Sequence, residues 1–150
     1  MVDLNPYNAR ILLELERDGR ISNVELAERV GLSSSACLRR VQELERRGLI
    51  KGYRAVLDRT QLGGAITVFV MVGLSDHLKK DALAFEAAMA KAPEVRECHN
   101  ITGSVEYLLR VEVDSLPSFK HFHTDVLGVL KQVGSITSHI SLGSSKDLRA

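Results

Sequence analysis

Residues 22–48 read SNVELAERVGLSSSACLRRVQELERRG, and this stretch decides the fold of the N-terminal part of the chain. Ser22, followed three residues later by Glu25, forms a capping box that starts a helix, and Gly31 ends it. Ser33 then caps a second helix, which continues to the end of the stretch. Helices joined by so short a glycine-containing turn cross steeply, so the stretch predicts a helix-turn-helix.

The second of these helices has one apolar face and one basic face. Its apolar positions recur at helical spacing, and Cys37 is one of them, as a small core residue. The opposite face carries Ser35, Arg39, Gln42 and Arg46. Such side chains donate hydrogen bonds to guanine edges and phosphates. The same periodicity describes any three-helix bundle, but the tight turn and the basic outward face together favour DNA binding.

Charge supports this interpretation locally rather than globally. The segment 33–54 has six basic and two acidic residues, whereas the whole chain has a net charge of only +1. A small basic patch on a near-neutral protein predicts a local site for a polyanion. A solvated helix face is the alternative explanation of the patch.

A further helix precedes the motif, and an extended arm follows it. Pro6 stands at a typical first helical position, Asn5 is a suitable cap, and Asp18-Gly19 ends this helix. The segment 49–58 alternates loosely between apolar and polar residues and predicts a short arm or wing. We expect the domain boundary at 61–65, where two glycines precede a dense run of strand-forming residues, so that the domains span 1–60 and 61–150.

The last ninety residues predict the order strand, helix, strand, strand, helix, strand. The expected strands are 66–74, 95–102, 105–113 and 136–142, with helices at 78–92 and 119–133. This is the order of a ferredoxin-like βαββαβ sandwich, and the predicted fold class is α+β. In the first strand Phe69 and Met71 make the second face apolar too, although two helices cover only one face of the sheet. We therefore expect a dimer that forms through the sheets.

Several classes of protein are excluded by composition and motifs. The apolar runs are far shorter than the roughly 20 residues of a membrane helix. The polar N-terminus predicts a cytoplasmic protein, and two distant cysteines fit no disulfide framework or zinc ribbon. His121 and His123 lie about 200° apart on a helix, so they cannot chelate one metal ion together. No catalytic or phosphate-loop motif is present, and we expect neither an enzyme nor a bound metal or cofactor.

Short motifs occur along almost the whole chain, namely DGRISNVELA (18–27), VGLS (30–33), RV (40–41), LE (44–45), GLI (48–50), GY (52–53), ECH (97–99) and GSVEYLL (103–109). Together they resemble the Lrp/AsnC family of transcriptional regulators. The resemblance implies a helix-turn-helix followed by a ligand-sensing domain, and dimers that often assemble into octamers. It also implies binding to promoter DNA and a response to small amino acids. The chain departs from the family pattern at Asn5 and Asn8, where Asp is frequent, and at Glu106, where a shorter Asp is common.

For DNA, we expect Ser34, Ser35, Arg39 and Gln42 nearest the base edges and Arg40 and Arg46 on phosphates. For the effector, Gly103 lets the backbone approach a ligand closely. Glu106 points away from the Val105/Tyr107 face and can accept hydrogen bonds from an ammonium group. A plain hairpin turn with a solvated Glu106 is the alternative. The resemblance adds Asn100, Tyr107 and His139 to the expected effector site.

The sequence thus predicts a sequence-specific transcriptional regulator whose DNA binding or assembly responds to a small amino acid. The alternative is an architectural DNA-binding protein whose second domain only forms oligomers and binds no effector.

Overall fold

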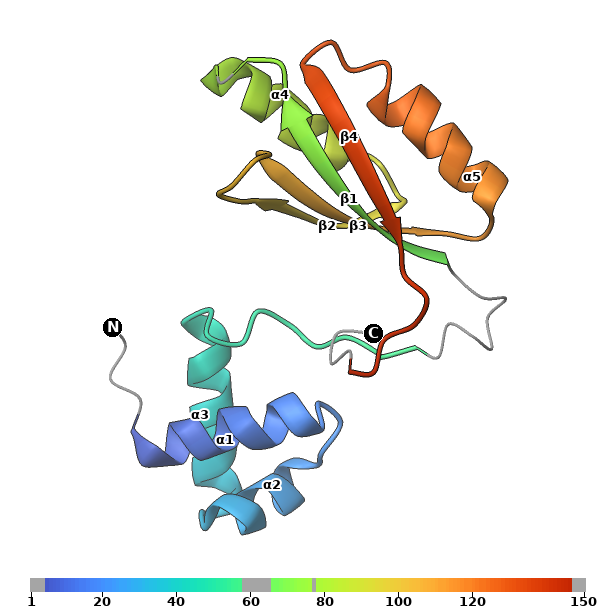
Figure 1. Ribbon diagram of the computed structural model, residues 1–150. Coiled ribbons are helices and arrows are strands. Elements are labelled where there is room, and N and C mark those ends of the chain that lie inside the picture. Colours follow the sequence, from blue (N-terminus) through green and yellow to red (C-terminus); the bar gives the residue numbers. More distant parts are fainter. Residues whose placement is uncertain (1–4, 58–65, 77, 147–150) are drawn as a thin grey trace. The chain divides into compact units, whose positions relative to one another are not determined.

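The computed structural model describes residues 5–57, 66–76 and 78–146. Its contacts divide the chain into two compact units, Met1–Val56 and Leu57–Ala150 (Figure 1). The expected domain boundary at 61–65 lies outside the described residues. None of the helices in the described ranges is long and apolar enough to cross a membrane.

Three helices form the first unit, α1 (Pro6–Arg17), α2 (Asn23–Val30) and α3 (Ser34–Arg46). Each begins at its predicted cap, since the side chains of Asn5, Ser22 and Ser33 accept backbone N–H groups of the first turns. Gly31 ends α2 in the left-handed conformation with φ +74°. The tight turn of the predicted helix-turn-helix is therefore confirmed.

The three helices enclose a small apolar core. Its fully buried residues are Ile11, Leu26, Ala27, Val30, Cys37 and Leu44. Cys37 is a core residue, as expected, and burial raises the pKa of its thiol. This core fixes which face of α3 is turned inward and leaves the opposite face exposed. The arm at 51–57 that follows α3 has no regular secondary structure.

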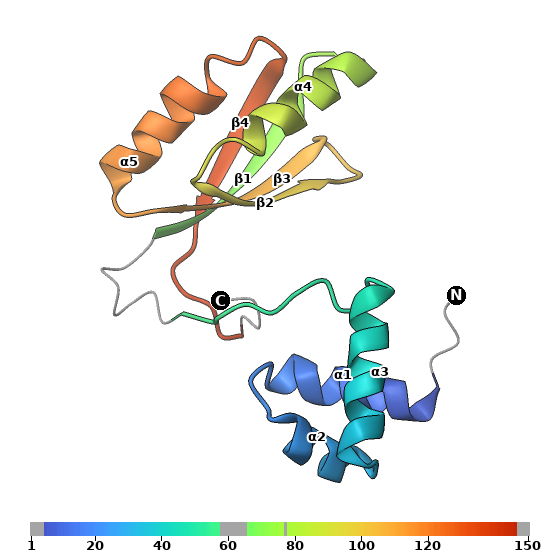
Figure 2. The same cartoon turned by 180° about the vertical axis from the view of Figure 1, so that it is seen from behind.

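The second unit is the expected βαββαβ sandwich. Its elements are β1 (Ile66–Leu74), α4 (Lys79–Met89), β2 (Val95–Asn100), β3 (Tyr107–Val113), α5 (Leu116–His121), the π-helix η1 (Phe122–Leu127) and β4 (Val133–Ile140). The strands form one antiparallel sheet in the order β2-β3-β1-β4. The α4 and α5–η1 helices pack on the same face of the sheet (Figure 2).

The second helical segment differs from its prediction. A single helix was expected over 119–133, but the helix begins at Leu116, changes to a π-helix at Phe122 and ends at Leu127. The N–H of Gly128 donates to the carbonyl of His123 at 2.9 Å, which is the wide hydrogen bond of a π-helix. A Cβ at Gly128 would lie 2.7 Å from the carbonyl oxygen of Thr124, so this end of the helix requires glycine.

Four other elements also differ from their expected bounds, and the second strand, β2, ends at Asn100 rather than at 102. The third strand starts at Tyr107 rather than at 105, since the preceding residues form the connection closed by the N–H of Ile101 and the carbonyl of Glu106, 2.8 Å apart. The last strand spans Val133–Ile140 rather than 136–142, because its pairing with β1 continues past Gly73 through a β-bulge. The helix expected over 78–92 ends at Met89.

The alternation along β1 is as predicted. Val68, Val70 and Val72 are fully buried beneath the helices. Phe69, which is 37% exposed, and Met71 lie on the opposite face. Within the described residues of this unit, both helical segments pack on the other face. We call it the open face, and its other members include Leu108 and Arg110 on β3 and Thr137 and His139 on β4.

Candidate nucleic-acid interface and ligand site

The exposed face of α3 carries most of the residues predicted to contact DNA. Ser34, Ser35, Arg39, Gln42 and Arg46 are all exposed. Cys37 and Leu44 are buried on the opposite side of the same helix. Ser35, Arg39, Gln42 and Arg46 therefore lie on the outward side of the helix, and Ser34 is exposed at its start, one turn before Cys37. Such a surface can offer hydroxyl, amide and guanidinium donors to the major groove of DNA.

The start of α3 is held by α2. The side-chain amide of Asn23 donates to the carbonyl of Ser34 at 2.8 Å, and the N–H of Leu32 donates to the carbonyl of Ala27 at 2.9 Å. These bonds fix the crossing of the two helices at the turn. Sequence reasoning did not find the role of Asn23, because a bond across eleven residues leaves no local pattern.

Arg46 is already paired within α3. Its Nη2 and Nε atoms lie 2.6 and 2.8 Å from the two carboxylate oxygens of Glu43, one turn earlier. Arg46 lowers the pKa of Glu43, which therefore stays ionised at neutral pH. A phosphate that binds Arg46 must compete with this carboxylate. Sequence reasoning counted Arg46 as a free cation and missed the pair, although the i,i+3 spacing signals it.

Arg40 turns toward α1 rather than toward the outward face. Its Nη1 donates to the side-chain oxygen of Asn8 at 3.0 Å, and its guanidinium carbon lies 5.4 Å from the centre of the Tyr7 ring. Arg40 is thus part-buried, whereas the other five predicted DNA-contacting residues are exposed, although Arg40 and Arg39 border one hollow with Asn8 and Glu43. At the far end of α3, Tyr53 of the arm donates its hydroxyl to Glu45 at 2.9 Å.

In the second unit, Glu106 joins the start of β3 to the end of β1. Its Oε2 accepts the backbone N–H of Leu74 at 2.7 Å, beside the bulge at Gly73/Leu74. A Cβ on Gly73 would lie 2.4 Å from Ser135 Oγ and 3.7 Å from Glu106 Oε2. Glu106 is part-buried and occupies a structural position, which differs from the freely solvated strand residue of the alternative interpretation.

Tyr107 lies on the opposite side of β3 from Glu106. It is 1% exposed, its hydroxyl donates to Glu86 of α4 at 2.8 Å, and its ring packs against Phe85 with centroids 4.6 Å apart. Burial raises the pKa of Tyr107, so its hydroxyl stays protonated and remains a donor. Asn100 is paired with Tyr107 in the β2–β3 register.

The five expected effector residues do not meet in one pocket of a single chain. His139 is exposed on the open face opposite Phe69, whereas Glu106 adjoins Gly73, four residues further along β1. Gly103 is exposed in the connection between β2 and β3, with φ +138°. Positive φ there confirms that this turn favours glycine.

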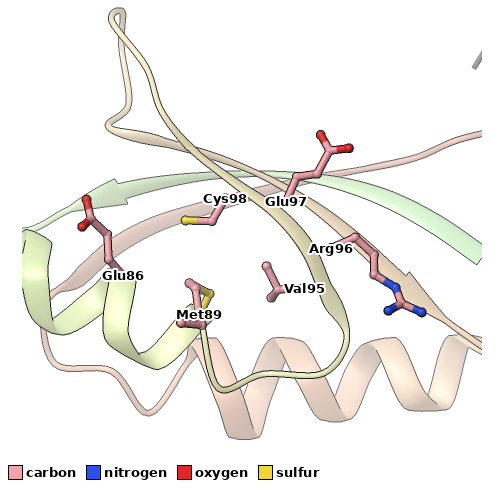
Figure 3. Close-up of a pocket in the computed structure, with 7 residues that line it drawn as sticks. Glu86, Met89, Val95, Arg96, Glu97 and Cys98 are labelled. Carbon is pink, nitrogen blue, oxygen red and sulfur yellow. The ribbon is translucent and has the colours of Figure 1, made fainter. Parts of the chain in front are cut away.

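A groove that sequence reasoning did not predict lies between α4 and β2 (Figure 3). Its volume is about 360 Å³, and its lining residues are Glu86, Met89, Ala90, Val95, Arg96, Glu97 and Cys98. Glu97 points away from the other side chains in this view. Burial raises the pKa of Cys98, so its thiol is protonated and poorly nucleophilic. Glu86 connects this groove to the hydroxyl of Tyr107.

Family models match both units of the chain. Residues 67–150 match the Lrp/AsnC ligand binding domain, and residues 4–51 match a winged helix-turn-helix DNA-binding model. The chain belongs to the Lrp/AsnC family. Members of this family are DNA-binding transcriptional regulators with a ligand-binding domain, not enzymes, and this chain is a regulator of that kind.

Individual relatives cover nearly the whole chain. The leucine-responsive regulatory protein of Rhizobium meliloti is 41% identical over 146 residues, which span 97% of this chain and 94% of that protein. The protein of that name from Escherichia coli K12 is 38% identical over 96% of this chain and 88% of its own length. A regulator from Neisseria meningitidis, solved with L-Met, superposes with a TM-score of 0.90 at 35% identity, covering 96% of this chain and 93% of that chain.

Removal of the Glu43 carboxylate frees Arg46 for DNA. We expect Glu43→Gln to strengthen binding to any duplex about twofold to tenfold. We also expect the dependence of log affinity on log salt to steepen by about one unit, because one more cation neutralises a phosphate. Fluorescence anisotropy at several salt concentrations measures both effects. Glu16→Gln, which removes the same charge from the exposed side of α1, is the control. An equal gain in the control would show that net charge alone acts.

Proposed function

We propose that the protein is a homodimeric regulator that reads promoter DNA through α3 and responds to a small amino acid bound in its second unit. The exposed polar and basic face of α3, fixed by the buried core beneath it, is the observation that carries the DNA-binding part. A cytoplasmic location, where the protein would meet promoter DNA, is part of this proposal. The proposal requires no metal or organic cofactor.

In this proposal α3 enters the major groove. The side chains nearest the base edges are those of Ser34, Ser35, Arg39 and Gln42. Arg46 leaves the Glu43 carboxylate and binds a phosphate instead. Two subunits then read a pseudo-palindrome whose half-sites are about one or more helical turns apart. The exposed guanidinium of Arg39 matches the two acceptors of a guanine edge.

The effector site is proposed around Gly103 and Glu106. The Glu106 carboxylate can accept hydrogen bonds from the ammonium group of an amino acid, and backbone N–H groups of the glycine turn can receive its carboxylate. The Neisseria meningitidis neighbour was solved with L-Met, which supports an amino acid as the ligand class. Tyr107 and Asn100, which are paired across β3 and β2, lie on the side of the sheet that the helices cover and stabilise β3 from that side. His139 shares the open face with Glu106, and its part in the site depends on a neighbouring subunit.

Dimerisation through the open face is the remaining part of the proposal. Phe69, Met71 and Leu108 form an apolar strip across β1 and β3. A charged network flanks it, in which Arg110 lies 2.9 Å from Glu112 and 3.4 Å from Glu97. An apolar strip with a charged margin has the composition of a subunit interface. We propose that these dimers assemble further into octamers, as the family resemblance implies.

Loss of the Arg39 side chain tests DNA reading. We expect Arg39→Ala to weaken binding to the cognate promoter by about 1–3 kcal/mol and to relax sequence preference, if the guanidinium pairs with a guanine. Sequencing of the DNA retained by the purified protein from genomic fragments supplies the cognate site. Anisotropy with that site and with a scrambled duplex measures the change. An Arg39→Ala, Arg46→Ala double variant that binds the promoter as wild type does would contradict the assignment.

Neutralisation of Glu106 tests the effector site. Glu106→Gln keeps an oxygen that can accept the Leu74 N–H, so the fold and the binding of DNA without effector stay near wild type. The affinity for the amino acid falls, because the amide lacks the charge that attracts an ammonium group. Calorimetry with the twenty amino acids identifies the effector and measures the loss. If none of the twenty binds, the protein is an architectural DNA-binding protein, and the sensing part of the proposal is wrong.

A charge on the open face tests the dimer. Met71 is opposite Leu108 and Thr137, which offer no cation, whereas Phe69 lies beside Arg110 and His139. We therefore expect Met71→Asp to bury an unpaired charge and to produce smaller or aggregated particles in multi-angle light scattering. Val129→Asp, at a site that is 64% exposed, is the control and keeps the wild-type mass. A soluble Met71→Asp variant of unchanged mass would show that this face is free.

A further inference from the structure

Two consecutive arginines of α3 have different surroundings. Arg39 is exposed on the outward face, whereas Arg40 is part-buried and directed at the first turn of α1. Neighbours on a helix point about 100° apart, and although both side chains border one hollow with Asn8 and Glu43, Arg40 reaches back to α1. The sequence alone assigns both to DNA. The structure gives Arg40 a different set of partners.

The first turn of α1 supplies the two side chains that contact the Arg40 guanidinium. Asn5 caps the helix by accepting the N–H of Tyr7 at 2.9 Å, which fixes the backbone of the turn. From this turn the Asn8 side-chain oxygen accepts Arg40 Nη1 at 3.0 Å, and the Tyr7 ring faces the guanidinium carbon at 5.4 Å. The planar guanidinium of Arg40 can donate to the Asn8 amide and lie over the Tyr7 ring at the same time. The ammonium group of a lysine would make this pair of contacts less well.

These contacts join the middle of α3 to the start of α1. The turn at Gly31 and the Asn23–Ser34 bond hold only the N-terminal end of α3. Apolar contacts have no preferred direction, so the core alone defines the orientation of α3 less sharply than a directed hydrogen bond does. The hydrogen bond at Arg40 supplies this direction. A small rotation of α3 would displace Arg39 and Gln42 together.

We propose that Arg40 is a positioning residue that sets the orientation of α3 through Asn8 and Tyr7, and that it does not bind phosphate. This proposal rests on the proposed reading of DNA by α3. In the full-length protein, Arg40 then affects discrimination between sequences more than affinity for DNA in general. A phosphate contact would do the reverse and would also contribute to the salt dependence.

Three variants separate the two roles. Arg40→Lys keeps the positive charge but loses the planar guanidinium group and its several N–H donors. Asn8→Ala keeps Arg40 and removes its acceptor. Asn8→Asp keeps an acceptor and serves as the conservative rescue. Each is measured by anisotropy against the cognate promoter and a scrambled duplex of equal length at several salt concentrations, with thermal melting as the check on folding.

We expect Arg40→Lys and Asn8→Ala to lower the ratio of specific to non-specific affinity by about tenfold each, since Asn8→Ala removes the hydrogen bond and Arg40→Lys weakens both the hydrogen bond and the cation–π contact. The salt slope stays unchanged. The double variant loses no more than either single variant, because both act on one contact. Asn8→Asp retains the wild-type ratio, although its charge weakens binding to both duplexes.

The opposite pattern overturns the proposal. If Asn8→Ala and Arg40→Lys keep the wild-type ratio while Arg40→Ala flattens the salt slope by about one unit, Arg40 is a phosphate contact. Arg39→Ala, measured in the same assay, shows whether the positioning role of Arg40 fails alone or together with the proposed reading of DNA by α3. If Arg39→Ala lowers the ratio and Asn8→Ala does not, the positioning role alone fails. If neither has an effect, the proposed reading of DNA by α3 fails as well.

Discussion

The alternation of side chains along β1 is the constraint on which the second unit depends. Its three buried valines take part in the core with both helical segments, and a shift of one residue would turn them to the open face. The same alternation exposes Phe69 and Met71. One strand therefore determines both the interior of this unit and the surface that we propose as the dimer interface. The bulge at Gly73/Leu74 ends this regular pattern at the point where Glu106 accepts the N–H of Leu74.

In the first unit, directed polar contacts complete what the apolar core begins. The core residues determine which side of α3 is buried. The caps and the turn at Gly31 determine where α3 starts, and contacts from Asn23, Asn8 and Tyr53 reach it at its beginning, middle and end. The side chains proposed to read DNA make none of these three contacts. Recognition and orientation are thus assigned to different side chains of the same short helix, although the backbone carbonyl of Ser34 accepts the bond from Asn23.

Local patterns in the sequence predicted the helix-turn-helix, the order of the sheet elements and the outward face of α3. Caps and alternation are short-range signals, which explains why Ser22, Ser33 and β1 were predicted correctly. The π-helix was not predicted, because apolar spacing does not distinguish a wider turn. The Arg40–Asn8 contact was missed since its partners are 32 residues apart. The distribution of Asn100, Tyr107 and His139 over both faces of the sheet depends on strand register, which no single segment encodes.

The Arg46–Glu43 pair has a consequence for the rate at which the protein finds DNA. Long-range attraction depends on the net field, and a cation that is neutralised by its own helix contributes little at a distance. If α3 reads DNA as proposed, capture of the duplex would depend on Arg39, Arg47 and Lys51, which are all exposed. Arg46 becomes available only after contact, when a phosphate replaces the carboxylate. Encounter is consequently slower than the number of basic residues suggests, and the lifetime of the complex depends more on the fit of α3 to the bases.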